Sequence, residues 1–278
     1  MYPSQACDVL GFVSIFRTNL LFMHEKPYDS PVIAAISNSF RNFFRKPGNV
    51  FSLMAPKTSS QTSVSVLTTW WAQPFNGQLM RFQACFEVCQ RFKPQIAIET
   101  GTFYGTTTVA LSSLVSGHTF TIEINEEYAN LADAYFKAIG LDDKKITILR
   151  GNSATEIVNV LSSVSRDSRV LVYLDAHWGE ELPLQDELSA LINWGGAFVV
   201  IIDDFYINYD NDFGFDSYGG IKLDLSLIPK DFSGHVFFPN HQAKQEYGAR
   251  RGTCFLVSST AATFISDINF AHLKYIEI

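Results

Sequence analysis

The sequence predicts an α/β fold: a doubly wound, mostly parallel sheet of seven strands, with an antiparallel hairpin at its C-terminal end and a helical extension at its N-terminus. Two observations support this prediction. From Gln95 onward, short apolar runs rich in β-branched residues alternate with segments of helical periodicity. The runs are almost continuously apolar, as expected for parallel strands that helices cover on both faces.

The first ninety residues lack this alternation. Their aromatic residues occur at loose helical spacing, and a polar segment interrupts the pattern over residues 56–63. A chain of 278 residues with 47% hydrophobic content can bury one large core. We therefore expect an N-terminal helical extension over residues 1–90 and one larger domain over residues 91–278. The extension could close over a ligand, mediate homo-oligomerisation or shield the sheet, and its sequence does not decide between these roles.

Along the chain, each expected parallel strand is followed by a helix. β-Branched and aromatic residues define the strands, and acidic residues near the start of a helix suit the positive end of its dipole. The expected strands cover residues 95–99, 118–123, 145–150, 169–175 and 197–203, and the antiparallel pair covers 234–239 and 253–258. The expected helices begin near residue 105 and cover 126–138, 153–163, 181–193 and a short stretch near 219–227.

A glycine loop links the first strand to the first helix of this pattern. Gly101 and Gly105 let the backbone turn sharply and approach a ligand closely, and the free amides of the following helix favour an electron-rich group. A P-loop would need Lys after the second glycine, and a dinucleotide fingerprint would need tighter glycine spacing. The loop therefore indicates a nucleotide-type ligand outside those two classes.

The pattern Glu99-x-Gly101-x-x-x-Gly105, with Glu123 ending the next strand, resembles the class I S-adenosylmethionine-dependent methyltransferases, which have a Rossmann-like fold. A carboxylate at position 123 can accept two hydrogen bonds from a ribose diol. The resemblance implies S-adenosylmethionine as the cofactor and, as its binding residues, Glu99, Gly101, Thr102, Tyr104, Gly105, Thr106, Glu123, Asn152, Ser153 and Asp175. Other readings stay open, because Glu99 and Glu123 could be ordinary solvated acids and Gly-Asn-Ser at 151–153 is also a common helix N-cap.

Acidic residues end the fourth and fifth expected strands. Asp175 follows the fourth strand, and Asp203 and Asp204 follow the fifth. Because the carboxyl ends of parallel strands meet at one edge of the sheet, these three side chains should converge there. Like charges so close together are costly without a compensating cation, and carboxylate oxygens suit Mg²⁺. The sequence therefore predicts a site for Mg²⁺ or a similar divalent cation.

This arrangement resembles the metal-dependent O-methyltransferases, most closely the macrocin O-methyltransferase-like family, which acts on sugar hydroxyls of natural products. The likeness covers about residues 95–258. It implies that Asp175, Asp203 and Asp204 bind the metal and that His177 is the catalytic base. Catechol- and caffeoyl-type relatives place Lys where this chain has Trp178, which argues against a catechol-type acceptor. Trp178 could stack on the acceptor or belong to the core.

The resemblance implies O-methylation of a hydroxyl on a sugar or another small metabolite. Two alternatives stay open: a metal-independent or cephalosporin-hydroxylase-like small-molecule methyltransferase, and a catalytically silent methyltransferase-fold binding protein. Near the last strand, Arg250 and Arg251 could orient an acceptor acid, pair with surface acids or brace the hairpin.

Composition and charge limit the classes of partner that we expect for this protein. The 28 acidic and 21 basic residues give a net charge of -7, whereas binding to nucleic-acid backbones relies on clustered Lys and Arg, so we expect no nucleic-acid partner. The most apolar N-terminal run, residues 9–23, is too short for a membrane span and contains Arg17. We therefore expect no membrane attachment and a cytoplasmic location. The four cysteines lack the spacing of a metal site and are expected to be buried free thiols.

Overall fold

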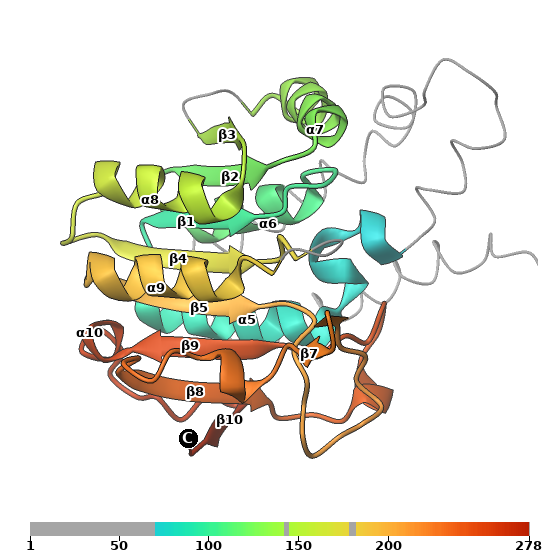
Figure 1. The fold of residues 1–278 in the computed structure, drawn as a ribbon, viewed down its shortest axis with the longest axis vertical. Helices are drawn as coiled ribbons and strands as arrows, with labels where there is room; N and C mark the ends of the chain where they lie inside the picture. The colour runs from blue at the N-terminus through green and yellow to red at the C-terminus, as the bar shows by residue number, and fades with distance from the viewer. Residues whose placement is uncertain (1–69, 142–144, 178–181, 278) are drawn as a thin grey trace, which may run out of the picture. The chain divides into compact units, whose positions relative to one another are not determined.

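The computed structural model describes residues 70–141, 145–177 and 182–277. These residues belong to one compact unit that begins at Thr69. Its centre is an eight-stranded sheet with the order β10-β8-β9-β5-β4-β1-β2-β3 (Figure 1). The parallel strands are β1 (Ile96–Thr100), β2 (Thr119–Glu123), β3 (Ile146–Arg150), β4 (Arg169–Leu174) and β5 (Ala197–Ile202). The antiparallel strands are β8 (Gly234–Pro239), β9 (Cys254–Ser258) and β10 (Leu273–Ile276).

The helices fill the connections between these strands. They are α5 (Leu79–Phe92), α6 (Thr106–Leu114), α7 (Glu126–Ala138), α8 (Ser153–Ser163), α9 (Leu184–Trp194) and α10 (Ser259–Ala262). Short 3-10 turns are η2 (Trp70–Ala72), η3 (Pro74–Gly77), η4 (Leu225–Leu227) and η5 (Ala243–Gln245). Helices α8 and α9 cover one face of the sheet, and α5 and α6 lie on the other (Figure 1). Right-handed crossovers dictate this division, since the chain reverses direction across the sheet after β3.

The predicted α/β fold is confirmed, and all seven expected strands are present. The sheet contains one strand more, β10, which pairs with β8. The prediction missed it because only Leu273 of its four residues is buried, so the apolar signal is weak. The order of the strands reverses between β1 and β4, which places a ligand crevice at the carboxyl ends of these two strands.

The helix expected near 219–227 is wrong. The chain there forms a two-stranded hairpin of β6 (Ser217–Tyr218) and β7 (Ile221–Lys222), followed by the short turn η4. Gly219 and Gly220 link the two strands with φ of +57° and +83°. Two consecutive positive φ angles match the tight turn of a hairpin and end any helix, so the glycine pair decides the local structure.

The N-terminal extension falls mostly on residues 1–69, outside the described part of the chain. Helix α5 lies within the same compact unit as the sheet. The boundary at residue 90 and a role of the extension in oligomerisation stay predictions. Among the cysteines, Cys85, Cys89 and Cys254 are buried free thiols as expected, and Cys7 lies outside the described residues. In the described ranges, the helices are too short or too polar to cross a membrane.

Candidate active site

The glycine loop brings the end of β1 against the end of β4. Gly101 has a φ of +83°, and a Cβ at this position would overlap the backbone oxygen of Asp175. Gly105 has a φ of +77°, and its Cβ would lie 2.5 Å from the ring of Phe136. Phe103, between them, also has a positive φ of 49°. A bulky residue in that conformation is strained, and such strain concentrates at ligand sites. At Gly101 and Gly105 a side chain would therefore collide with the Asp175 backbone and with the Phe136 ring, so both positions require glycine.

Glu123 holds the tip of this loop. Its Oε2 accepts a hydrogen bond from the backbone amide of Phe103 at 2.9 Å, and its Oε1 accepts one from the amide of Asn125 at 2.8 Å. Below the tip, the hydroxyls of Thr102 and Thr121 lie 2.6 Å apart. The ring of Tyr104 packs against Phe103, with 4.0 Å between the ring centroids. Gly101, Thr102, Tyr104, Gly105 and Glu123 are therefore brought together as the sequence predicted, and buried Thr106 begins α6 directly behind them.

Glu99 lies beneath the loop, away from solvent. Its Oε2 accepts hydrogen bonds from the hydroxyls of Thr108 and, at 2.6 Å, Thr121. Its other carboxylate oxygen is buried without a hydrogen-bond partner. Burial raises the pKa of Glu99 to about 8, against the two hydroxyls, which lower it. The carboxyl group therefore carries its proton at neutral pH and packs the loop against α6 and β2.

We expect the variant Glu99→Gln to change how stability depends on pH. Folded Glu99 keeps its proton up to about pH 8, whereas the unfolded carboxyl, with its ordinary pKa of 4.5, releases it above about pH 5. The wild-type protein therefore loses stability relative to Glu99→Gln as the pH rises from about 5 to about 8, by up to about 1.4 kcal/mol per pH unit. Urea unfolding at several pH values measures this, with the exposed Glu127→Gln as control. If the unfolding free energies of wild type and Glu99→Gln changed with pH in the same way, this prediction would be contradicted.

Asn152 and Ser153 occupy the carboxyl end of β3, as predicted. The Oδ1 of Asn152 accepts a hydrogen bond from the amide of Ala154 at 2.9 Å and caps α8. Ser153 is buried at the first helical position. The ordinary N-cap is thus present, and a contact of these residues with the cofactor stays a prediction.

Asp175, His177 and Asp204 form a cluster at the ends of β4 and β5. One potential ligand atom from each lies within 4.8 Å of the others. Burial and the neighbouring acids raise the pKa of Asp175 well above its usual range. Burial and the charge of Asp203 raise the pKa of Asp204 to about 7, although Arg251 opposes the shift. Two carboxylates crowded in this way favour a bound proton or cation.

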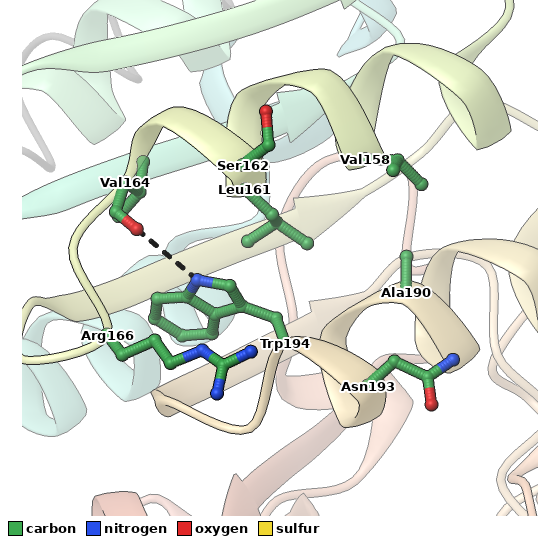
Figure 2. A pocket seen from close by; sticks show the side chains of 8 residues that line it. All are labelled: Val158, Leu161, Ser162, Val164, Arg166, Ala190, Asn193 and Trp194. Atoms are coloured by element: carbon green, nitrogen blue, oxygen red, sulfur yellow. Dashed lines mark hydrogen bonds between the residues drawn. The ribbon is translucent and has the colours of Figure 1, made fainter.

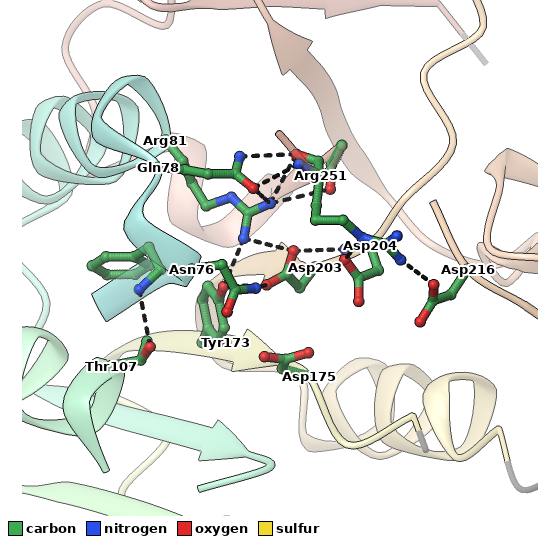
Figure 3. A network of polar contacts seen from close by, with 12 residues as sticks. Asn76, Gln78, Arg81, Thr107, Tyr173, Asp175, Asp203, Asp204, Asp216 and Arg251 are labelled. Carbon is green, nitrogen blue, oxygen red and sulfur yellow. Dashed lines mark hydrogen bonds and ion pairs between the residues drawn. The ribbon is translucent and has the colours of Figure 1, made fainter. Parts of the chain in front are cut away.

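The carboxylate of Asp203 has different neighbours from that of Asp204, although the two residues are adjacent in the sequence (Figure 3). Its Oδ1 lies 2.6 Å from Nη1 of Arg81 and accepts the amide of Asp204 at 2.7 Å. Its Oδ2 accepts the hydroxyl of Tyr173 at 2.7 Å and the side-chain amide of Asn76 at 2.9 Å. Four donors occupy the four lone-pair positions of a carboxylate. The role of Asp203 as a metal ligand stays a prediction. Its carboxylate pairs with Arg81, and its charge also acts on Asp175, His177 and Asp204.

The backbone of Asp204 explains why the two adjacent acids diverge. Asp204 has a φ of 55°, in the left-handed region that Asp tolerates better than most residues. Arg251 pairs with Oδ1 of Asp204 through Nε and with Oδ1 of Asp216 through Nη2. Arg251 was expected to pair with surface acids, but one of its two partners, Asp204, is buried.

His177 is buried, with 1% of its surface exposed. Its imidazole makes no side-chain hydrogen bond with the described residues, and the backbone of Asp203 is its hydrogen-bonding neighbour. Nε2 lies 3.9 Å from Oδ1 of Asp175, and the ring meets the edge of Tyr218 with 5.9 Å between centroids. Burial lowers the pKa of His177 to about 4, outweighing Asp203, which favours the protonated ring. The imidazole is therefore neutral at neutral pH. Trp178 lies outside the described residues.

The sequence model of one family, described as Rhamnosyl O-methyltransferase/CmcI, matches residues 62–219, which is more than half of the chain. The matched range includes the glycine loop, Arg81 and the cluster at Asp175, His177 and Asp204. The chain belongs to this family. It is a class I S-adenosylmethionine-dependent O-methyltransferase, as the resemblance implied. Comparison with curated protein sequences gave no match.

Solved structures similar to this O-methyltransferase include an O-methyltransferase from Bacillus cereus in complex with SAH. Its identity is 13% and its TM-score 0.48, with 84% of this chain and 92% of that chain covered. The O-methyltransferase TomG from Streptomyces achromogenes, involved in tomaymycin synthesis and solved with SAM, is 14% identical with a TM-score of 0.45. The match covers 87% of this chain and 96% of that chain. Spermidine synthase from Thermotoga maritima is 16% identical with a TM-score of 0.46, and the match covers 71% of this chain and 67% of that chain. Likeness at this level adds nothing to the family assignment.

The polar groups around Asp203 in this O-methyltransferase were missed by the sequence analysis. Arg81 sits on the buried face of α5, together with Cys85, Val88 and Phe92. A charged residue within an otherwise apolar helical stripe is a signal that could have been used, because it requires a buried partner. Asn76 gave no such signal, since it lies in the turn η3.

A hollow of about 510 Å³ lies between α8 and α9 of the O-methyltransferase, beside Trp194 and Arg166 (Figure 2). It is lined by the C-terminal halves of both helices, which lie at the opposite edge of the sheet from the carboxyl ends of the strands. None of the residues discussed above lines it. It is therefore separate from the glycine loop and the acidic cluster.

Proposed function

We propose that this O-methyltransferase transfers the methyl group of S-adenosylmethionine to a hydroxyl of a sugar or another small natural-product metabolite, with the help of a divalent cation. One observation carries the proposal. The glycine loop and the acidic cluster lie close together, because a Cβ at Gly101 would overlap the backbone oxygen of Asp175. A cofactor held by the loop and a cation held by the cluster would therefore be neighbours at one edge of the sheet.

The cofactor-binding part rests on the loop and on Glu123. When bound, S-adenosylmethionine supplies an electrophilic methyl group on a sulfonium. Glu123 fixes the loop through two amide hydrogen bonds, at 2.9 and 2.8 Å. Each of its oxygens retains a further lone pair, so the carboxylate can also accept a ribose diol.

The donor set around Asp175 fits a divalent cation. Asp175 and Asp204 are crowded carboxylates with raised pKa values, and His177 beside them offers a neutral imidazole. A bound divalent cation would supply positive charge that lowers the pKa of an acceptor hydroxyl. Asp175 and Asp204 would hold it, while Arg251 fixes the orientation of Asp204. The neutral ring of His177 can either accept the hydroxyl proton or bind the cation.

One observation favours a second candidate, methyl transfer without a metal. The predicted metal ligand Asp203 is bound by four protein donors. In that case Asp203 would be a structural anchor, and His177 would act as the base alone.

Calorimetry on metal-stripped, full-length protein tests the proposal. We expect S-adenosylmethionine to bind without metal and Mg²⁺ or Mn²⁺ to bind afterwards. We expect Glu123→Gln to weaken cofactor binding by at least about tenfold, because hydrogen bonds to charged groups contribute about 1.5–3 kcal/mol each. The exposed Glu127→Gln, on the first turn of α7, is the matched control. Cofactor binding without any metal binding would select the second candidate, and no cofactor binding would overturn both.

A chemical test follows from the acceptor proposal. Protein loaded with isotope-labelled S-adenosylmethionine should transfer the labelled methyl group to a hydroxyl when sugars and glycosylated metabolites are screened, and a chelator should suppress the transfer. Transfer only to non-sugar acceptors would restrict the proposal to small metabolites in general.

A further inference from the structure

Two tryptophans lie exposed in the turn η2, at the start of the described unit. Trp70 has 38% of its surface exposed and Trp71 has 47%, although tryptophan is mostly buried in folded proteins. Turn η2 leads through Gln73 into η3. Large apolar side chains that gather at a surface mark binding sites more often than those that occur singly. The position of η2 and η3 therefore decides what these side chains can bind.

Turn η3 is attached to the edge of the sheet that holds the active site (Figure 3). The amide of Phe75 donates to the hydroxyl of Thr107 at 3.0 Å, in the first turn of α6 behind the glycine loop. The side chain of Asn76 donates to Oδ2 of Asp203 at 2.9 Å, directly after β5. The backbone oxygen of Asn76 accepts the amide of Ala249 at 3.1 Å. The segment that carries the tryptophans is thus tied to both the glycine loop and the end of β5.

The backbone of η3 is held in a strained conformation. Phe75 and Asn76 have φ angles of 53° and 57°. Residues other than glycine keep such angles only where the surrounding contacts enforce them. Phe75 is 1% exposed, and its ring meets that of Tyr173 edge-on with 5.4 Å between the centroids. The segment next to Trp71 is therefore fixed before a ligand binds, which lowers the entropic cost of binding there.

The indole of Trp71 is separated from the acidic cluster by one side chain. The guanidinium carbon of Arg251 lies 5.9 Å from the centre of the Trp71 ring. The same guanidinium pairs with the carboxylates of Asp204 and Asp216. An acceptor whose reacting hydroxyl lies at the cluster can therefore place the rest of its body against the indole.

The polar groups beside the indole favour a hydroxylated ring over a planar aromatic acceptor. The side chain of Asp216 is 34% exposed, and its oxygens accept from Arg251 and from Tyr218, which leaves further lone pairs for hydroxyl donors. A sugar ring presents hydroxyls along its edge and C–H groups on its face, and these C–H groups suit the negative face of an indole. A planar aromatic acceptor would cover the same polar groups without giving them new partners, which is costly.

We propose that Trp71 is the surface on which the sugar ring of the acceptor stacks. This inference rests on the proposed function and deepens it, because it assigns the acceptor class to a named side chain. Trp71 lies before the predicted glycine loop and strands, so neither the loop nor the acidic cluster contains it. Its replacement should weaken acceptor binding and leave cofactor binding unchanged.

Saturation-transfer NMR on the full-length protein with bound S-adenosylhomocysteine tests the contact. The probes are the methyl glycosides of glucose, galactose, mannose and fucose. The protein is deuterated everywhere except at tryptophan, so that only indole protons can pass saturation to a glycoside. At least one glycoside should receive saturation on its ring C–H protons.

Conservative variants identify which indole is responsible. Trp71→Phe should remove the saturation transfer, because the phenylalanine ring keeps an aromatic face but carries no protons in this labelling scheme. Trp178→Phe should keep it, and this variant is the comparison because the sequence left stacking by Trp178 open. Circular dichroism and binding of S-adenosylhomocysteine check that each variant folds.

Kinetics with the acceptor from the labelled-methyl screen give the size of the effect. Trp71→Ala should raise the KM for this acceptor at least about tenfold, as expected for an aromatic anchor, with kcat within about threefold. Trp71→Phe should raise KM by less than about threefold. Phe264→Ala is the matched control and should change neither value. Phe264 is also 47% exposed and also lies near an arginine, Arg169, which begins β4 at the opposite edge of the sheet.

Saturation transfer that persists in Trp71→Phe would overturn the inference, and so would its loss in Trp178→Phe. No transfer to any of the four glycosides, in protein that binds S-adenosylhomocysteine, would also overturn it while leaving the methyltransferase function intact. Loss of S-adenosylhomocysteine binding in a folded Trp71→Ala variant would place Trp71 at the cofactor and likewise overturn it. Wild-type protein that binds no S-adenosylhomocysteine would instead remove the proposed function on which the inference rests.

Discussion

Replacing Arg81 with methionine should lower the free energy of unfolding by about 3–5 kcal/mol, the usual cost of leaving one partner of a buried ion pair uncompensated. The side chain of Arg81 is 1% exposed and that of Asp203 is fully buried, with 2.6 Å between Nη1 and Oδ1. The guanidinium also donates to the hydroxyl of Tyr173, to Oε1 of Gln78 and to the backbone oxygen of Arg251. Methionine fills similar volume but provides neither the charge nor the donors.

Urea unfolding followed by circular dichroism measures the loss. The control is Lys137→Met, which removes an exposed ion pair with Asp133 of 2.7 Å, where the Lys137 side chain is 67% exposed. Exposed pairs of this kind contribute less than about 1 kcal/mol. In the double variant Arg81→Met with Asp203→Asn, part of the loss should be recovered, because the unpaired charge is gone. Equal effects of Arg81→Met and Lys137→Met would show that Arg81 does not form a buried pair.

The contacts of Asp203 with Arg81 and Asn76 also show which features of the site could not be predicted from the sequence. The strands around the site were predictable, because β5 is buried along its whole length and is apolar throughout. The glycine loop was predictable because its spacing and the strand before it occur together. The pairing of Asp203 with Arg81 and Asn76 was not, since these residues come from segments more than 120 positions earlier in the chain and meet only in the folded molecule.

The acidic cluster shows the same limit at the level of single atoms. The sequence indicated correctly that Asp175, Asp203 and Asp204 follow neighbouring strands. It could not indicate that the positive φ of Asp204 separates the side chains of two adjacent aspartates, because an Asp can adopt either the extended or the left-handed conformation and tertiary contacts decide between them. Which carboxylate oxygens stay free of protein donors is therefore a property of the tertiary structure.

The second large effect is expected for Gly101→Ala. An alanine with the observed φ of +83° costs about 1–2 kcal/mol by itself. Its Cβ would also overlap the backbone oxygen of Asp175, and a forced shift in a packed region adds about 1–3 kcal/mol. The variant should therefore lose roughly 2–5 kcal/mol of unfolding free energy.

Gly140→Ala separates these two contributions. Gly140 has nearly the same φ, +78°, but no atom of the described residues lies within 4 Å of the position where its Cβ would be. Only the backbone cost of about 1–2 kcal/mol should remain in this control. Similar losses for both variants in urea unfolding would mean that the ends of β1 and β4 are not in close contact.

The same pair of variants tests whether the cofactor loop and the acidic cluster behave as one site. An alanine at position 101 must move either the loop or the backbone of Asp175, since the atom it meets belongs to the main chain and cannot rotate away. Binding of S-adenosylmethionine and of Mn²⁺ should therefore weaken together in Gly101→Ala and stay unchanged in Gly140→Ala. Loss of cofactor binding with unchanged Mn²⁺ binding would instead mean that the loop yields alone and that the cluster is positioned by β4 and β5.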